Sequence, residues 1–390
     1  MQLSVIILNY NVRYFLELCV LSVQKAIQNL DAEIIVIDNN SSDDSCAMMK
    51  QRFPNVKLIE NKENSGFPKG NNIAVREAKG EYLCILNPDT VVSEDTFEKL
   101  LSFVSSQAQS RDDLGIVGCK LIDGTGNFLP ESKRGIPTPW VAFTKIFGLY
   151  KIFPKSSMFN KYYAQDLAEN QTGKVDILVG AFMVMKRELY NELGGFDENC
   201  FMYADDIDLS YRALLLQKQN CYFHETTVIH YKGESTVKDA TYMKHFRGFM
   251  NYFYQKHFKR SLFFNLMARF GAFYFSIVKV FKGKSQPKVK PNQYILVSDN
   301  EALKEKLATK LQKSVERTLL ENGKIVISQT ISKAKNTEVI LDTNYLGFKK
   351  AIAFLEENKN KSFTFKLLPI GSNFIIGSNS SNDRGEVINL

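Results

Sequence analysis

Three stretches decide the fold, and all lie in the first quarter of the chain. They are QLSVIILNYN at residues 2–11, EIIVIDNNSSDD at residues 33–44 and YLCILNPD at residues 82–89. Each begins as a short apolar run rich in β-branched residues, which is typical of a buried strand, and ends in polar residues. Helical patterns at 12–29, 42–52 and 69–78 alternate with these runs and with a further strand at 56–60. The alternation predicts an α/β fold whose parallel sheet binds ligands beyond the carboxyl ends of its strands.

The remaining sequence predicts further elements and two more regions. Residues 137–171 are aromatic and irregular, which indicates loops and short helices, and patterns at 175–185 and 207–216 indicate a strand and a helix. Residues 246–281 indicate one or two helices, and 282–291 form a basic linker that contains proline. Beyond it we expect strands at 294–297, 324–328, 338–342 and 363–369 and helices at 302–316 and 345–358. The predicted organisation is a catalytic domain at 1–240, a basic aromatic segment and linker at 241–291, and a small α/β accessory domain of unknown role at 292–390.

Composition bounds the class of protein. The chain has 390 residues, 44% of them hydrophobic and 24% charged, which is typical of a globular protein with more than one domain. The start, MQLSVIILNYNV, lacks the basic region and cleavage site of a signal peptide. Six cysteines are scattered without CxxC pairs, which favours reduced thiols in a cytoplasmic protein.

Charge is unevenly distributed along the chain. Between Ala240 and Ser298 there is no Asp or Glu, against eleven Lys or Arg and many aromatic residues. This pattern indicates an anionic partner, and the apolar residues between the charges favour a membrane surface over nucleic acid. Residues 262–281 are apolar for about the width of a bilayer, but Asn265, Arg269 and Lys279 interrupt them. We therefore favour an interfacial helix, with a buried core helix and a spanning helix as alternatives.

Sugar transfer from a nucleoside diphosphate needs a cation for the leaving group, a carboxylate to accept the acceptor's proton, and polar groups for base and ribose. Asn87-Pro88-Asp89 follows a buried strand. Asp89 there is a hard oxygen ligand suited to Mg²⁺ or Mn²⁺, or an ordinary turn residue. His230 ends another apolar run, and its place after Asp89 makes it a candidate ligand, although a lone histidine is more often packed or exposed.

Three carboxylates, Asp205, Asp206 and Asp208, lie within four residues at the start of a predicted helix. They repel one another, which raises pKa values and is tolerable where a cation or a proton transfer needs them. Complementarity with the helix dipole explains one or two of them equally well.

Two polar loops are candidates for holding the donor. Asp38, Asn39 and Asn40 end the second strand, where the following serines also cap a helix. A loop containing Gly66 and Asn71 opens the next helix and either turns the chain or brings backbone N–H groups to a ligand.

Taken in order, six segments resemble the family-2 glycosyltransferases of the GT-A fold, close to their rhamnosyltransferase-like branch. They are VIILNYN, VIDNNSSDDS, ENSGFPKGNN, ILNPDTVV, VGAFMVMKRELYNELGGFDENCFMYADDIDLSYR and VIHYKGEST. Each is modestly specific alone, but six in the correct order are highly specific. The resemblance spans roughly residues 2–236 and leaves 292–390 unassigned. It implies a GT-A fold with a mixed, mainly parallel sheet and C-terminal helices.

The resemblance also implies roles for individual residues. Asp89 matches the last carboxylate of the family's DxD motif, whose first acidic position is Asn87 here, and His230 matches a histidine that completes the metal site. Asp206 matches the aspartate of the ED motif, the inferred base, and Asp205 stands where that motif usually has Glu. The resemblance, with the strand-end pattern, gives the donor contacts Asn9, Asp38, Asn39, Asn40, Gly66, Asn71 and Asn87.

The implied activity is an inverting, Mg²⁺- or Mn²⁺-dependent transfer of a hexose to a hydroxyl of a bacterial surface-glycan precursor. The branch suggests L-rhamnose from dTDP-rhamnose, with UDP-sugars as alternatives, a glycan or lipid-linked acceptor, and a place at the inner face of the cytoplasmic membrane; nucleic acid is not expected. A non-catalytic scaffold or glycan-binding protein is the alternative. A nucleotidyltransferase would need a Gly-rich, Arg-containing loop after the first strand, where this chain has Asn9-Tyr10-Asn11.

Overall fold

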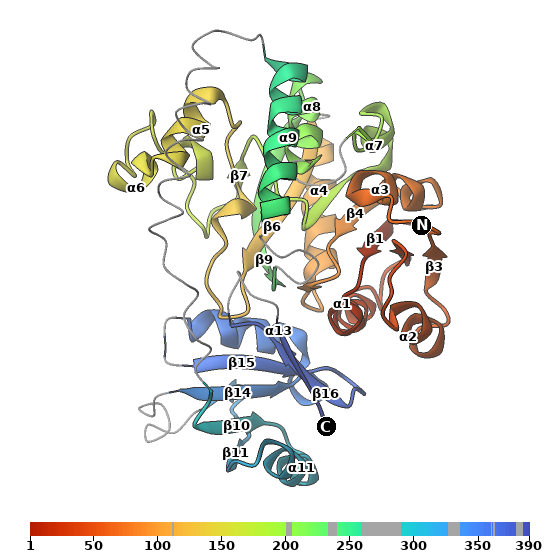
Figure 1. Ribbon diagram of the computed structural model, residues 1–390, viewed down its shortest axis with the longest axis vertical. Helices are drawn as coiled ribbons and strands as arrows, with labels where there is room; N and C mark the ends of the chain where they lie inside the picture. Colours follow the sequence, from red (N-terminus) through yellow and green to blue (C-terminus); the bar gives the residue numbers. More distant parts are fainter. Residues whose placement is uncertain are drawn as a thin grey trace.

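The computed structural model describes residues 1–110, 113–199, 205–232, 240–258, 290–326, 336–359, 361, 363–379 and 385–390. Within these residues the chain forms a nine-stranded sheet, a separate six-stranded sheet and a two-stranded hairpin (Figure 1). Helices accompany both large sheets. The predicted α/β class with a mixed, mainly parallel sheet is therefore confirmed.

The first half of the large sheet follows the predicted alternation. Strands β1 (Leu3–Asn9), β2 (Ala32–Asp38), β3 (Lys57–Glu60) and β4 (Tyr82–Leu86) lie in the order β3-β2-β1-β4, and all their pairs are parallel. The intervening helices are α1 (Arg13–Ala26), α2 (Ser45–Arg52) and α3 (Gly66–Arg76). Every residue of β1 is buried, as expected for a central parallel strand covered on both faces.

Alternate residues of β1 face two different helical layers. Val5 and Ile7 belong to a core that contains residues of α1, α2 and α4 (Thr96–Ser110). Ile6 and Leu8 belong to a core that contains residues of α3, α7 (Arg187–Glu192) and α8 (Asp205–Leu215). The two-residue period of a strand thus explains why an unbroken apolar run is needed here.

The second half of the sheet is mixed. Strand β8 (Phe182–Lys186) pairs antiparallel with β4, and β6 (Leu114–Ile122) with β9 (Gln219–His230) extends the sheet beyond it. The short strands β5 (Thr90–Val91) and β7 (Gly173–Lys174) both pair with β9.

The predicted strand at 175–185 is wrong in its first half, because β8 begins only at Phe182. Residue Ile177 exchanges backbone hydrogen bonds with Arg134, and Leu178 N–H and Gly180 N–H bond side chains of α8. This apolar run is therefore buried as a loop.

Short helices follow β6, as the irregular segment predicts. They are η1 (Pro130–Ser132), α5 (Pro139–Ile146), α6 (Leu149–Ile152) and η2 (Lys161–Tyr163). Helix α9 (Ala240–His257) runs beside α8 and shares a small apolar core with it through Ile207 and Phe253 (Figure 1). The predicted interfacial helix at 262–281 lies outside the described residues. Among those that are described, no helix is long and apolar enough to span a bilayer. None of the five described cysteines forms a disulfide.

The six-stranded sheet has the order β11-β10-β14-β15-β16-β17. Its strands are β10 (Gln293–Val297), β11 (Val315–Thr318), β14 (Thr337–Asp342), β15 (Phe363–Leu368), β16 (Phe374–Gly377) and β17 (Glu386–Asn389), with helices α11 (Glu301–Leu311) and α13 (Thr343–Glu357) and the hairpin β12 (Leu320–Glu321) and β13 (Lys324–Ile325). The helix predicted at 302–316 is wrong at its end. Gln312 takes a left-handed conformation with φ of 51° and turns the chain into β11. The tail from Gly371 onward contributes β16 and β17.

The two large sheets share one apolar core. It contains Phe15 of α1, Ile229 of β9 and Tyr231 together with Phe348 and Leu355 of α13. Polar contacts surround it: Glu94 accepts hydrogen bonds from the backbone of Phe348 and Lys349 at 2.6 and 2.7 Å. The described residues from 290 onward are thus packed against the large sheet through a shared apolar core.

Candidate active site

The carboxyl ends of β1 and β2 lie side by side and carry a closed polar network. Asn9 and Asp38 are register partners, and Asn9 Nδ2 donates to Asp38 Oδ1 at 2.7 Å. Ser41 joins both, because its backbone N–H donates to Asp38 Oδ2 at 2.8 Å and its Oγ accepts from Asn9 Nδ2 at 3.1 Å. Asn40, between them, is exposed and left-handed with φ of 64°. The network holds this edge in place and leaves Asn9 Oδ1 as a buried acceptor without a hydrogen-bond partner among the described residues.

Asn39 lies in the next network, around the loop that opens α3. Its Oδ1 accepts from Asn61 Nδ2 at 2.8 Å and from Ser65 Oγ at 3.0 Å, and its Nδ2 donates to Asn64 and to Gly66 O at 3.1 Å. All its polar atoms are therefore used inside the protein. In this structure Asn39 holds the Gly66 loop, which turns with φ of 79° at Gly66. Asn71 is buried within α3 and donates to Phe67 O, while its Oδ1 has no hydrogen-bond partner in the part of the chain that the structure describes.

Asp89 and His230 are brought together by a strand pair. β5 pairs with the end of β9, so that Thr90 is the register partner of His230, and Tyr231 N–H donates to Asp89 O at 3.0 Å. Asp89 Oδ1 lies 3.5 Å from His230 Nε2, and Asn87 Nδ2 lies 3.4 Å from the same nitrogen. Asn87 and His230 follow or end different strands and are 143 residues apart in the chain, and they thus contribute to one polar site.

A divalent cation fits the chemistry of this pair. One carboxylate and one imidazole are ligands that Mg²⁺ or Mn²⁺ accepts, and both residues are buried at 4% and 6% exposure. His230 Nδ1 is buried without a hydrogen-bond partner in the described part of the chain. Among the described residues, no third His, Cys, Asp or Glu completes a cluster of metal ligands. The pair could supply part of a coordination shell, in which the oxygens of a ligand would have to fill the remaining positions.

Asp206, in the first turn of α8, reaches the same edge of the sheet. Its Oδ2 accepts a hydrogen bond from Gly180 N–H at 3.0 Å, while the next residue, Ala181, accepts one from Asn87 N–H at 3.0 Å. The loop before β8 thus links the predicted base to the predicted metal site. Asp205 is also buried, at the first position of the helix.

The partner of Asp206 is Arg134, which the sequence did not single out. Arg134 Nη2 donates to Asp206 Oδ2 at 2.6 Å and to Leu178 O at 2.9 Å. Burial lowers the pKa of this guanidinium, but Asp206 and Tyr162 outweigh that effect and leave the pKa above its usual value. Arg134 lies in a loop 72 residues before Asp206. The only feature of the sequence that marks it is a basic residue directly before the apolar run that starts at Gly135.

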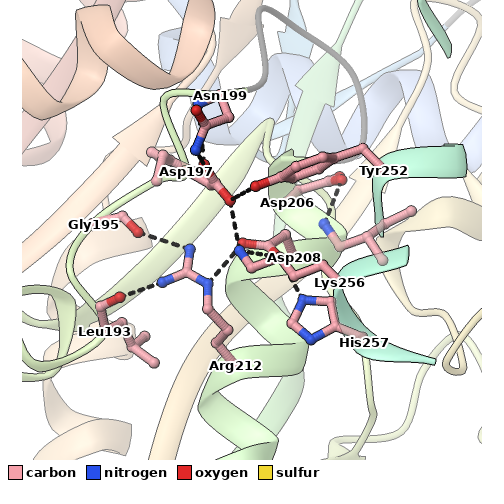
Figure 2. A network of polar contacts seen from close by, with 12 residues as sticks. Leu193, Gly195, Asp197, Asn199, Asp206, Asp208, Arg212, Tyr252, Lys256 and His257 are labelled. Carbon is pink, nitrogen blue, oxygen red and sulfur yellow. Dashed lines mark hydrogen bonds and ion pairs between the residues drawn. The ribbon is translucent and has the colours of Figure 1, made fainter. Parts of the chain in front are cut away.

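The expectation of raised pKa values in this cluster of carboxylates is wrong for Asp208. Figure 2 shows its carboxylate between Arg212, Lys256 and His257, at 2.7, 2.9 and 2.7 Å. Burial raises the pKa of Asp208, but the hydrogen bond from His257 and the two cations lower it below its usual value. Asp208 therefore joins α8 to α9, which explains the third carboxylate structurally.

The similarity to a known protein family lies in the first half of the chain. Residues 4–194 match the family described as Glycosyl transferase family 2. The chain is 25% identical over 217 residues, 53% of its length and 68% of the other's, to the N-acetylglucosaminyl-diphospho-decaprenol L-rhamnosyltransferase of Mycobacterium tuberculosis. It is 28% identical over 226 residues, 54% of its length and 78% of the other's, to the rhamnosyltransferase WbbL of Escherichia coli strain K12.

Solved structures with a similar arrangement are more distant in sequence. The mannosyltransferase PcManGT from Pyrobaculum calidifontis, in complex with GDP-Man and Mn²⁺, matches with a TM-score of 0.44 at 18% identity, over 73% of this chain and 76% of that one. S. aureus TarS 1–349 matches with a TM-score of 0.42 at 17% identity, over 59% of this chain. The match spans 60% of the length of that TarS chain.

Proposed function

Since residues 4–194 form a family 2 glycosyltransferase domain, we propose that the chain is an inverting, metal-dependent hexosyltransferase of bacterial surface-glycan synthesis. The observation that carries this proposal is the gathering of Asp38, Asn87, Asp89, His230 and Asp206 at one edge of the large sheet. L-Rhamnose from dTDP-rhamnose is the proposed donor sugar, because two of the similar proteins are named as rhamnosyltransferases.

The donor would lie across the carboxyl ends of β1, β2 and β4. Asn9 and Asp38 form the rigid floor for base and ribose, and Asn40 and the backbone of the Gly66 loop border it. Asp89 and His230, with Asn87 beside them, would hold Mg²⁺ or Mn²⁺ at the diphosphate. When bound there, the cation supplies the positive charge that stabilises the leaving group.

Asp206 is the proposed general base. A carboxylate held by Arg134 and Gly180 N–H is oriented before the acceptor arrives, which lowers the cost of positioning it. It would take the proton of the acceptor hydroxyl while that oxygen attacks the anomeric carbon, and a single displacement inverts the configuration. Asp205, one residue earlier and also buried, is the alternative base.

The acceptor and location follow as further parts of the proposal. One similar protein is named for a diphospho-decaprenol acceptor, and a lipid-linked glycan is the proposed acceptor of this chain. Residues 1–240 would perform catalysis and residues 292–390 would support them structurally. The acid-free sequence from 241 would contact the inner face of the cytoplasmic membrane peripherally.

A thermal-shift series with the full chain tests the proposal. We expect dTDP-rhamnose to raise Tm in the presence of Mn²⁺ or Mg²⁺ and to raise it much less with EDTA, whereas the variant Asp89→Asn should lose the metal-dependent part. UDP-glucose and UDP-galactose serve as competing donors. Transfer is then followed with the stabilising donor and a lipid-linked GlcNAc-diphosphate acceptor. Absence of a shift with every donor, in both metals, would contradict a nucleotide-sugar site, and retention of configuration in the product would contradict the single displacement.

A further inference from the structure

Helices α5 and α6 and the loop after them expose an unusual number of large apolar side chains. Five of the ten exposed large hydrophobics among the described residues lie in this one short segment. Their exposed fractions are 39% for Trp140, 36% for Ile146, 64% for Ile152, 49% for Phe153 and 58% for Met158. We name these five residues, with the exposed Lys151, Lys155 and Lys161, the α5–α6 patch. Apolar side chains concentrated at one place on a surface mark an interaction site more often than scattered ones do.

The charge around the patch has one sign. No Asp or Glu occurs between Glu131 and Asp166, whereas this stretch contains five lysines and Arg134. Lys151 and Lys155 flank the most exposed apolar pair, Ile152 and Phe153. The patch therefore combines apolar tips with cations and offers no carboxylate to a basic partner.

The aromatic side chains of the patch are held in place by one another. Trp140 Nε1 donates to Met158 O at 3.0 Å, and its indole stacks on Phe143 with ring centroids 5.6 Å apart. Phe153 packs on Phe159 at 5.2 Å between centroids. Thr138 caps α5 by accepting from Val141 N–H. Because these groups are ordered beforehand, a partner meets a preformed surface and loses less entropy on binding.

We propose that the α5–α6 patch binds an anionic lipid bilayer. Trp and Phe insert favourably at the boundary between headgroups and acyl chains, and lysines beside them interact with acidic headgroups. A second copy of this chain suits the patch poorly, since a two-fold contact would bring the same lysines face to face. The α5–α6 patch is distinct from the segment at 241–291, which lacks Asp and Glu. The patch consists entirely of residues that the structure describes.

The patch is connected to the candidate active site through direct contacts. Lys145 of α5 lies 3.7 Å from the ring centroid of Tyr162, and Lys145 and Arg134 together lower the pKa of the Tyr162 hydroxyl, against the burial that raises it. Arg134 in turn holds Asp206. Helix α9 packs against the same segment, because Tyr254 OH donates to Pro137 O at 2.8 Å (Figure 1). A bilayer at the patch would bring a lipid-linked acceptor toward Asp206; this last step rests on the proposed function.

Trp140 is the only tryptophan of the chain and reports directly on the patch. The full chain is mixed with phosphatidylcholine vesicles with and without 30% phosphatidylglycerol, so that lipid charge is the only variable. With the anionic vesicles we expect a blue shift of the emission, quenching by bromine-labelled acyl chains, and co-flotation that weakens in 1 M NaCl. With neutral vesicles each effect should be at least several-fold smaller.

The double variant Ile152→Glu/Phe153→Glu should abolish the blue shift and the quenching. It adds negative charge at two exposed positions that we expect to insert into the bilayer. Leu319→Glu/Val326→Glu is the matched control, because these side chains are 44% and 43% exposed at the two ends of the β12–β13 hairpin. Flotation without any change in Trp140 emission would overturn the proposal and place the contact elsewhere. If the blue shift occurs without vesicles and depends on protein concentration, it identifies self-association instead. Absence of flotation with the anionic vesicles would also refute the proposal. These readouts need no transfer, so failure of the proposed activity would leave them unaffected.

Discussion

Arg134 Nη2 donates to Asp206 Oδ2 at 2.6 Å, and the two side chains are only 10% and 12% exposed. The carboxylate that we propose as the general base is therefore paired with a cation. Two effects of this pairing can be separated by substitution: Arg134 stabilises the fold, and it orients the Asp206 carboxylate.

Asp206→Asn should reduce transfer at least about 100-fold, because an amide cannot take the acceptor's proton. Donor affinity, measured by the metal-dependent thermal shift, should change less than about threefold, a change below 1 kcal/mol. Asp205→Asn is the paired variant. If it removes transfer while Asp206→Asn retains it, the roles of the two aspartates are exchanged.

Arg134→Gln should lower the free energy of unfolding by about 3–5 kcal/mol, since it leaves the Asp206 carboxylate buried without a counter-charge. The double variant Arg134→Gln/Asp206→Asn should be more stable than the sum of the single changes predicts, because no unpaired charge remains. Denaturant unfolding of the four proteins measures this coupling. Strict additivity would mean that the pair makes no net contribution.

His230→Ala should weaken the Mn²⁺ dependence of donor binding about tenfold or more, because it removes one of the two proposed protein ligands. His224→Ala provides a control on the same strand, since the His224 ring hydrogen-bonds Thr172 and lies six positions before His230 in β9. Titration of Mn²⁺ at fixed donor concentration gives the apparent affinity. Equal effects of the two variants would remove His230 from the metal site.

Asp208 should contribute stability that depends on pH. Its folded pKa is lowered by His257 and the neighbouring cations against burial. The contribution is therefore complete above the unfolded value of about 3.9 and is lost as the pH falls through the lower folded value. Asp208→Asn should destabilise the protein at pH 7 by about 3 kcal/mol, and its difference from the unchanged protein should shrink below pH 4. Urea midpoints across this range test the sign.

Phe348→Ala should destabilise the whole chain, because this fully buried ring of α13 lies in the core that both sheets share. We expect a loss of about 3–5 kcal/mol in one cooperative transition. Val326→Ala, at a 43% exposed position, should change stability by less than about 0.5 kcal/mol. Two separate transitions in the Phe348→Ala variant would show that the second sheet folds independently.

Much of the fold was predictable because its strands and helices follow hydrophobic patterns that repeat every few residues. The strands at β1, β2 and β4 and their polar ends are local patterns, and parallel strands bring such ends to one edge. The same rule placed Asn9, Asp38 and Asn87 together. Errors arose where an apolar run is buried by something other than a sheet, as at 175–181, or where one left-handed residue ends a helix, as at Gln312.

The sequence by itself thus determined the alternating α/β plan, the family and the candidate donor and metal residues, since each is encoded by neighbouring positions or motif order. Only the tertiary structure decided the partners of those residues. Arg134 meets Asp206 across 72 positions, and His257 meets Asp208 across 49. The reason is physical: a buried charge must find a counter-charge wherever packing brings one, and no local period of the chain records which distant loop supplies it.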